Sequence, residues 1–270
     1  MKKSFVDYSV PIRTRKGNFL SIFLSAYREE GLYYVLRTAP KYLSDICFVR
    51  IPNYFSFCYY NWFKSSETFN FDGDKYNYFF HPYWNTWDNE RCAVIPIVWK
   101  KVLEYQKRGK NILEIGNVTS YLYNVGHDIL DKYEVTNGVI NEDIVDFHPS
   151  KKYDFIFSFM TLQYVGWHES PPDHTKASRA LENLMSILSP DGMIMIIHGI
   201  GENKTMDELL KSGKFKFTKE FYLRKIGGYK WTESDWESVK DLNYDYSNHT
   251  AVGVFIGFME NKSNPDSDNR

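Results

Sequence analysis

The sequence predicts an α/β fold with a mostly parallel sheet, an antiparallel edge strand and an N-terminal extension of helices and a hairpin. Two strand-like runs, residues 111–116 and 152–165, are the first observation behind this prediction. The earlier run is apolar and β-branched and gives way to a polar turn, as a buried strand does at its carboxyl end. Strand-like and helical runs then alternate, and two strand-like runs close the chain. This order is typical of a parallel sheet with an antiparallel edge.

The composition favours one α/β domain plus an extension. The chain has 270 residues, of which 43% are hydrophobic and 18% aromatic, enough for one full core. The formal net charge of -1 gives no basic field, so we expect no nucleic-acid partner and favour a small molecule. Cys47, Cys58 and Cys92 form no Cys-x-x-Cys pair, which predicts reduced thiols and a cytoplasmic location. We find no signal peptide or membrane-spanning run and expect neither.

Residues 1–91 form the predicted extension. Two apolar runs, residues 19–27 and 31–39, predict short amphipathic helices, and Pro40 predicts a break after them. Residues 69–80 alternate around an Asp-Gly pair, which predicts a small hairpin.

The first part of this extension, residues 1–60, is basic and rich in aromatic residues. Cations and aromatic rings together suit the surface of a bilayer, so peripheral contact with the inner face of the membrane is one expectation. The alternatives are that these helices cover an exposed face of the catalytic domain or form a dimer contact. The oligomeric state is not predicted.

Residues 92–260 form the predicted α/β domain, and the polar tail 261–270 is predicted to be disordered. A helix at 93–106 has one broad apolar face, and a second helix at 176–188 ends in a Ser-Pro-Asp-Gly turn. The predicted strands are 111–115, 128–130, 138–141, 154–159, 193–197, 216–224 and 251–259.

Four of these segments, in this order, resemble the motifs of class I S-adenosylmethionine-dependent methyltransferases. They are residues 112–116 (first motif), 141–144 (adenine-side loop), 153–165 (fourth strand) and 188–197 (fifth strand). The resemblance implies a Rossmann-like sheet, S-adenosyl-L-methionine as cofactor and transfer of its methyl group to a small molecule or glycan. We expect an oxygen acceptor in preference to nitrogen.

Shorter segments resemble a narrower microbial group of these enzymes that is linked to polysaccharide and surface-glycan synthesis. These segments are 81–83, 89–91 and 138–143. Polysaccharide biosynthesis is therefore the expected setting.

The resemblance implies cofactor contacts at the ends of the first two strands. Gly116 would let the main chain approach the amino-acid part, beside Asn117, and Glu114 would orient its ammonium group. Asp131 would hold the ribose hydroxyls, with Glu134 as second choice. The alternatives are an ordinary strand-to-turn junction at Glu114 and Gly116, and solvated loop charges at Asp131 and Glu134.

The adenine is expected to lie between later segments. Asp143 would accept a hydrogen bond from the adenine amine while the backbone N–H of Ile144 donates to the ring. Phe159 and Met160 would flank the adenine or the methyl group. A surface acid at Asp143 and plain core packing at Phe159 and Met160 are the alternatives.

The first motif departs from the family pattern because no second glycine follows Gly116. Residues 117–119 are Asn-Val-Thr, and only about ten residues separate Gly116 from the next strand, so the usual first helix must be short or remodelled. This departure keeps two other functions open: a non-catalytic nucleotide-binding or scaffold protein, and a nucleotide-sugar enzyme.

Candidate catalytic residues follow the fourth and fifth strands. His168, with Glu169 beside it, is the first choice as base or acceptor-positioning group, and His198 is the second. Gln163 and Tyr164 stand where many family members carry an acid and a histidine, so we expect them near the acceptor. A loop histidine without catalytic duty is the alternative for each histidine.

His81, Tyr83 and Arg91 are predicted to cover the acceptor, with Arg91 binding a carboxylate or phosphate. The alternative is aromatic packing beside a charge at a helix start. No His-x-x-x-His, Gly-x-Ser-x-Gly or Gly-Lys-Ser/Thr pattern occurs, so we predict no metal site and no hydrolase or P-loop chemistry.

Overall fold

The computed structural model describes residues 19–45, 47–48 and 51–261. The chain divides into two compact units, of which the first ends at Tyr59 and the second begins at Tyr60. The expectations for the N-terminal 18 residues and for the tail from residue 262 lie outside the described residues. The predicted domain boundaries at residues 91 and 260 stay predictions.

Helices make up the described part of the first unit and continue into the second. Helix α1 (Phe19–Asp45) contains both predicted helices, and α2 (Ile51–Phe63) follows it. The break predicted at Pro40 is wrong, because α1 continues through this proline and instead changes direction at Gly31, where φ is 85°. A glycine adopts this left-handed conformation at low cost, and the proline ring is accommodated without ending the helix. No helix within the described ranges is both long and apolar enough to cross a bilayer.

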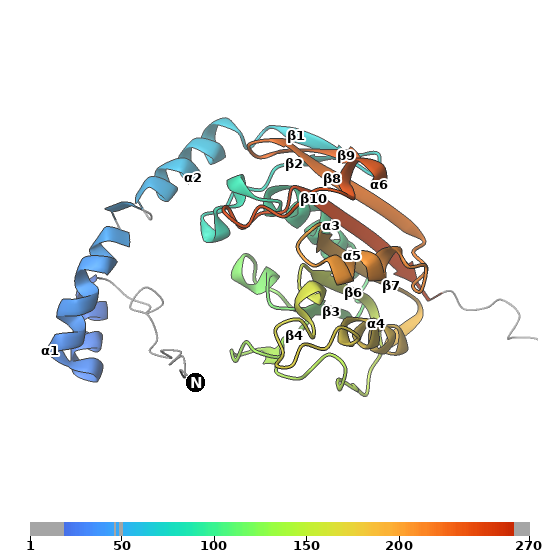
Figure 1. Cartoon of the computed structure of the whole chain (residues 1–270), viewed down its shortest axis with the longest axis horizontal. Helices are drawn as coiled ribbons and strands as arrows, with labels where there is room; N and C mark the ends of the chain where they lie inside the picture. The colour runs from blue at the N-terminus through green and yellow to red at the C-terminus, as the bar shows by residue number, and fades with distance from the viewer. Residues whose placement is uncertain (1–18, 46, 49–50, 262–270) are drawn as a thin grey trace, which may run out of the picture. The chain divides into compact units, whose positions relative to one another are not determined.

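The second unit is built on an eight-stranded sheet with the order β5-β4-β3-β6-β7-β10-β8-β9 (Figure 1). Its strands are β3 (Ile112–Ile115), β4 (Asp128–Leu130), β5 (Val139–Ile140), β6 (Tyr153–Phe159), β7 (Leu188–Gly199), β8 (Lys219–Gly227), β9 (Lys230–Ser234) and β10 (Gly253–Glu260). Strands β5, β4, β3, β6 and β7 pair in parallel. Strand β10 is antiparallel to β7 and β8, and the edge strand β9 is antiparallel to β8. The predicted fold class is therefore confirmed.

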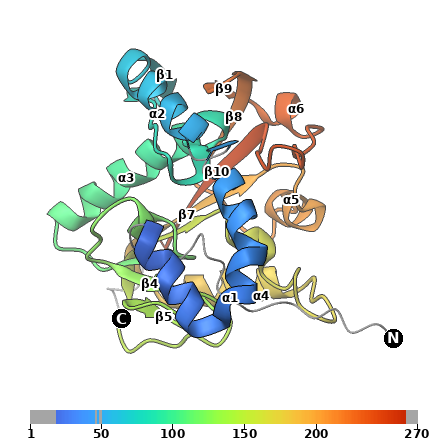
Figure 2. The ribbon, with the colours of Figure 1, turned by 90° about the vertical axis from the view of Figure 1, so that its left-hand side faces the viewer.

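The sheet lies between two layers of helices (Figure 2). Helix α3 (Arg91–Lys107) covers one face, where the ring of Tyr105 stacks on Phe155 of β6 at 4.7 Å between centroids. Helices α4 (Lys176–Ser186) and α5 (Lys204–Lys211) cover the other face. There Leu181 and Leu184 pack in one core cluster with Ile156 of β6. Because side chains alternate along a strand, β6 supplies both cores.

The predicted hairpin is present as β1 (Thr68–Phe71) and β2 (Asp74–Asn77). Its turn residues Asp72 and Gly73 have φ of 49° and 76°, which suits a tight Asp-Gly turn. Phe71 contacts Phe221 of β8 at 4.9 Å between ring centroids. The hairpin therefore packs on the main sheet rather than standing alone.

Several elements differ from the prediction. The strand predicted at 193–197 extends over the whole of β7, whose pairing with β6 jumps from Leu188 to Met193. The polar segment between the last two predicted strands forms β9 and the short helix α6 (Trp236–Val239), neither of which was predicted. Helix α5 was also missed, and three 3-10 turns are present, of which only η4 lies where a short or remodelled helix was predicted. These turns are η3 (Tyr83–Asp88), η4 (Thr119–Tyr121) and η5 (Leu162–Tyr164).

Candidate functional site

A cavity of about 560 Å³ opens where β3, β4 and β6 end. Strand order reverses between β3 and β6, and open α/β sheets bind ligands at this switch point. Twelve of the predicted site residues line the cavity. They are Arg91, Gly116, Asn117, Asp131, Glu134, Asp143, Ile144, Phe159, Met160, Tyr164, His168 and Glu169.

Glu114, at the end of β3, is fully buried and does not line this cavity. Its carboxylate accepts hydrogen bonds from the backbone N–H groups of Val118 and Thr119, both at 2.8 Å, and from the Thr119 hydroxyl. The ring Nε2 of His127 lies 3.0 Å from the second carboxylate oxygen. Glu114 therefore holds the turn after β3 from the buried side, and its predicted role toward the cofactor stays a prediction.

Gly116 begins this turn with φ of 83°, a conformation that other residues adopt at a cost. A Cβ atom at this position would overlap the hydroxyl of Thr161, which follows β6. The backbone of Gly116 also donates a hydrogen bond to Leu130 at 2.9 Å. Two constraints thus require glycine here, and Gly116 lines the cavity. The short turn η4 stands where the spacing predicted a short or remodelled first helix.

The carboxylate of Asp131 lies just past the end of β4. It accepts hydrogen bonds from the backbone N–H groups of Tyr133 and Glu134, at 2.8 and 2.9 Å, and from that of Asn117 at 3.3 Å. Glu134 accepts a bond of 2.7 Å from the side chain of Asn117 and another from the Tyr121 hydroxyl. These bonds tie the turn after β3 to the loop after β4, so both carboxylates are fixed at the cavity wall.

Asp143 takes part in a cluster of four charges. Lys132 lies 2.8 Å from its carboxylate and Lys176 lies 2.5 Å from it. Both lysines also pair with Glu169. Burial disfavours the ionised form of Asp143, but the two lysines outweigh burial and hold the pKa of this carboxyl below its usual value.

The same lysines hold the pKa of Glu169 below its usual value. Glu169 is thus an ion-pair partner in this structure, and its carboxylate is engaged beside the predicted adenine site. Sequence reasoning missed both lysines. The only signal was that Lys132 directly follows Asp131.

Phe159 and Met160 close the bottom of the cavity, and both are buried. Met160 has φ of 53°, and its backbone N–H donates to Ile197 of β7 at 3.0 Å. This left-handed residue ends β6 and turns the following segment across the cavity. Ile144 also lines the cavity and belongs to the core cluster beside α4.

His168 lines the cavity and stacks on Tyr164, with 5.3 Å between ring centroids. Arg91 lines the cavity at the start of α3, where it pairs with buried Glu90 at 3.0 Å and lies over the ring of Trp84. The guanidinium Nε of Arg91 is buried and has no hydrogen-bond partner among the described residues. His168, Tyr164 and Arg91 are therefore the predicted acceptor-side residues that the structure brings to one cavity.

His198 and Gln163 lie behind the cavity wall, each only 1% exposed. The two rings of the predicted lid, His81 and Tyr83, do not line the cavity either. His81 accepts a hydrogen bond from the backbone of Tyr83 at 3.1 Å, and burial lowers its pKa. Tyr83 stacks on Tyr121 at 4.8 Å.

The part of the chain that the structure describes holds no group of three or more His, Cys, Asp and Glu side chains arranged for a metal ion. The residues present fit an adenosyl ligand instead. Gly116 and Asn117 line the cavity at the turn after β3, Asp131 and Glu134 offer carboxylates for ribose hydroxyls, and Ile144 and Met160 offer apolar walls for a base.

No protein-family model matches the sequence, and a search of curated proteins finds no similar sequence. Solved structures do resemble the fold at low identity. The N-methyltransferase NodS of Bradyrhizobium japonicum, in complex with S-adenosyl-L-homocysteine, is 12% identical over 66% of this chain and 95% of its own, with a TM-score of 0.39.

Two further solved structures are similar to the same extent. A possible histamine N-methyltransferase of Thermotoga maritima is 15% identical over 66% of this chain and 99% of its own, with a TM-score of 0.35. The sugar N-methyltransferase KedS8 of a Streptoalloteichus species is 12% identical over 62% and 86%, with a TM-score of 0.32. The likeness of these three structures to this chain concerns the fold alone.

Proposed function

We propose that this protein transfers a methyl group from S-adenosyl-L-methionine to an oxygen or nitrogen atom of a small molecule or glycan. The single observation that carries the proposal is the position of the Asp131 carboxylate. It is fixed at the end of β4 by three backbone N–H groups and faces the cavity beside Gly116. A carboxylate beside the turn after β3, at the switch point of the sheet, suits an adenosyl ligand.

Different residues of the chain would bind different parts of this ligand. Asp131 and Glu134 would bind the ribose hydroxyls, and the backbone at Gly116 and Asn117 would bind the amino-acid end. When bound, S-adenosyl-L-methionine supplies an electrophilic methyl group on a sulfonium. Tyr164, His168 and Arg91 line the remaining wall and would orient the acceptor and exclude water.

Calorimetric titration with S-adenosyl-L-homocysteine tests this function. We expect binding by the wild-type protein and a loss of about 10- to 100-fold in affinity for Asp131→Ala, since hydrogen bonds to a charged group are removed. Glu104→Ala, on the outer part of α3, is the matched control and should bind as wild type does. Undetectable binding, or binding that Asp131→Ala leaves unchanged, would favour a scaffold protein. Thermal protection by a nucleotide sugar alone would favour the nucleotide-sugar enzyme.

We also propose that α1 and α2 contact the surface of an anionic membrane. Helix α2 has no buried residue, and Tyr54, Phe55 and Trp62 are 61%, 68% and 73% exposed. Arg28 and Arg37 on α1 are exposed as well. Aromatic rings and cations on helices favour the bilayer interface.

Flotation with vesicles tests this contact. We expect the full chain to float with phosphatidylglycerol vesicles and much less with phosphatidylcholine vesicles, and Phe55→Ser with Trp62→Ser to lower recovery. Ile226→Ser is the matched control, since Ile226 is an exposed apolar side chain at the end of β8. Dimerisation that the same double substitution abolishes, without flotation, would assign these helices to a contact between copies.

A further inference from the structure

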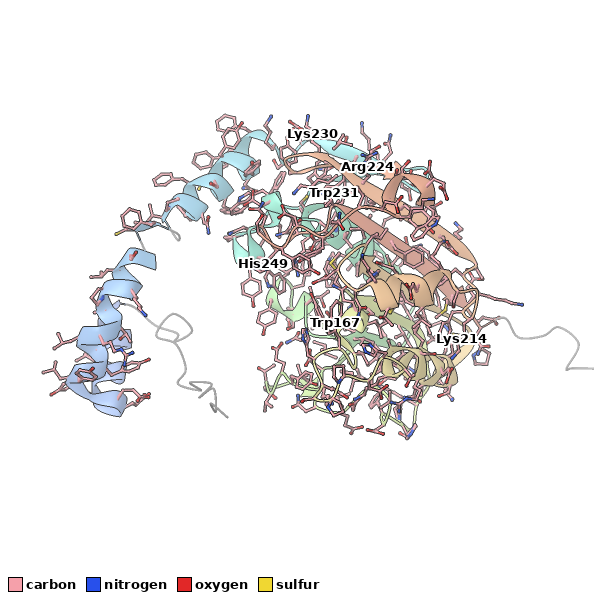
Figure 3. All side chains as sticks on the ribbon, in the orientation of Figure 1. Trp167, Lys214, Arg224, Lys230, Trp231 and His249 are labelled. Carbon is pink, nitrogen blue, oxygen red and sulfur yellow. The ribbon has the colours of Figure 1, made fainter. Side chains whose placement is uncertain are left out.

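A second cavity, of about 370 Å³, lies next to the one described above. Val165 lines both cavities, and the second is otherwise formed by the segment after β6, the start of α4 and the loop between β7 and α5. Two carboxylates, a lysine and aromatic side chains line it: Glu202, Asp173 and Lys204, with Trp167, which is labelled in Figure 3, His174 and Tyr246.

Glu202, three residues after the end of β7, is the central group of this region. Its carboxylate accepts hydrogen bonds from the side-chain amide of Gln163 and from the hydroxyl of Tyr164. Tyr164 lines the first cavity, whereas Glu202 lines the second. The Glu202 carboxylate therefore stands at the wall between the two cavities.

A buried hydrogen-bond network fixes this carboxylate from behind. The Oε1 atom of Gln163 accepts a bond from the backbone of Gly199 at 3.3 Å and lies 3.0 Å from Nδ1 of His198. Asp207 lies 2.6 Å from the other ring nitrogen of His198. Because the Gly199 N–H requires the amide oxygen on its side, the amide nitrogen of Gln163 must face Glu202.

The carboxylate of Glu202 also lies near Met160, the residue that follows β6. A Cβ built on Gly199 would lie 3.6 Å from Oε2 of Glu202 and 3.8 Å from the terminal methyl of Met160, which lines the first cavity. Burial raises the pKa of Glu202, and Arg91, which forms no ion pair with this carboxylate, offsets the rise only in part.

The carboxylate of Glu202 is partly buried and accepts hydrogen bonds from neutral donors. Burial raises the pKa of Glu202, and its two hydrogen-bond donors are neutral groups. Among the described residues no lysine or arginine pairs with this carboxylate. Anions removed from water are usually paired, and aromatic faces favour a nearby ammonium group.

We propose that the second cavity binds a methyl acceptor that carries an amine, and that Glu202 binds its ammonium group and takes its proton. This inference rests on the proposed function. The deprotonated amine nitrogen uses its lone pair to bond the donor's methyl carbon. The carbon–sulfur bond of the donor breaks, and its electron pair stays on sulfur as a neutral thioether. Glu202 takes the proton that the ammonium loses, and water carries it away.

The experiment measures binding of D-glucosamine to protein saturated with S-adenosyl-L-homocysteine, with D-glucose as the neutral probe of the same size. We expect glucosamine to bind the wild-type protein, glucose to bind at least about ten-fold more weakly, and Glu202→Gln to lose about 10- to 100-fold in affinity for glucosamine. Glu208→Gln is the matched control, because this exposed carboxylate on α5 lies outside the second cavity.

The two proposals fail in different ways. Calorimetry with S-adenosyl-L-homocysteine should give the same affinity for Glu202→Gln as for wild type. If neither protein binds S-adenosyl-L-homocysteine, the methyltransferase function is overturned. If S-adenosyl-L-homocysteine still binds, three results overturn only the present inference. Glucosamine fails to bind, glucosamine binds no more tightly than glucose, or glucosamine binds Glu202→Gln as tightly as wild type. The thermal midpoint of Glu202→Gln checks its folding, and Tyr164→Phe, which keeps the ring, should weaken glucosamine by a smaller factor.

Discussion

The two ends of the first cavity are built in opposite ways. Beside the end formed by β3 and β4, the buried Glu114 and the partly exposed Asp131 accept hydrogen bonds from backbone N–H groups, and these bonds need no ligand. At the other end, Asp143 and Glu169 are satisfied by the side chains of Lys132 and Lys176. The first end is therefore preorganised, whereas a ligand must compete with ion pairs at the second.

The largest expected effect is at the preorganised end. Glu114→Ala leaves two backbone N–H groups, a hydroxyl and His127 without their buried partner, so we expect a loss of about 3–5 kcal/mol in the free energy of unfolding. Urea denaturation measures it. Glu104→Ala, which removes only a surface pair with Lys101, should change stability by less than about 0.5 kcal/mol. Equal losses for the two variants would contradict the role of Glu114.

A smaller loss is expected for Gly116→Ala, about 2–4 kcal/mol, from its left-handed φ and the overlap with Thr161. Gly109→Ala is the matched control, since Gly109 has φ of 64° but no atom within 4 Å of its added Cβ. It should lose only about 1–2 kcal/mol. Adding Thr161→Ser to Gly116→Ala would leave the clash, whereas Thr161→Ala should restore part of the stability. No recovery with Thr161→Ala would show that the contact does not limit residue 116.

The ion-paired end should respond in the opposite direction. Lys176→Met removes one competitor for the carboxylate of Asp143, so we expect affinity for S-adenosyl-L-homocysteine to rise by about 2- to 10-fold, the net worth of one hydrogen bond. Calorimetric titration measures this change. Lys151→Met, which removes a lysine paired with Asp128 instead, should leave the affinity unchanged. Weaker binding by Lys176→Met would mean that the lysine supports the ligand.

The smallest effect is the pH dependence of stability. The lysines hold the pKa values of Asp143 and Glu169 below the usual 3.8 and 4.5. Folding therefore gains stability from these groups above those usual values, and the gain is lost as the pH falls toward the lower folded-state values. Urea denaturation between pH 6 and pH 3 should give a flatter profile for Asp143→Asn with Glu169→Gln than for wild type. Parallel profiles would count against the ion pairs, and Glu104→Gln should follow wild type.

The sequence predicts much of the fold because hydrophobic patterns are local. The run at 128–130 coincides with β4, and the alternating run with its Asp-Gly turn coincides with the first hairpin. Strand β9 escaped prediction because only one of its five side chains, Trp231, is buried, so its sequence shows no alternation. Pattern reasoning cannot find a strand whose stability comes from pairing with a neighbour.

Some residues of the site could be predicted from the sequence, whereas contacts that depend on the tertiary fold could not. Asp131 was predicted from its place at the carboxyl end of a parallel strand and Asp143 from the resemblance of residues 141–144 to an adenine-side loop, and both line the first cavity. The pairing of Lys176 with Asp143 depends on α4 folding back over the sheet, which no spacing in the sequence encodes. Glu202 was missed in the same way, since its partners precede it by nearly forty residues.

The bonds from Glu114 to the turn after β3 also bear on how fast that turn can open. The amides of Val118 and Thr119 are bonded to a carboxylate that has no exposure to water, so they should exchange hydrogen with solvent as slowly as core strand amides do. Fixing a backbone residue costs about 1–2 kcal/mol in conformational entropy. This turn is already ordered in the folded protein, so a ligand that binds there does not have to order its backbone.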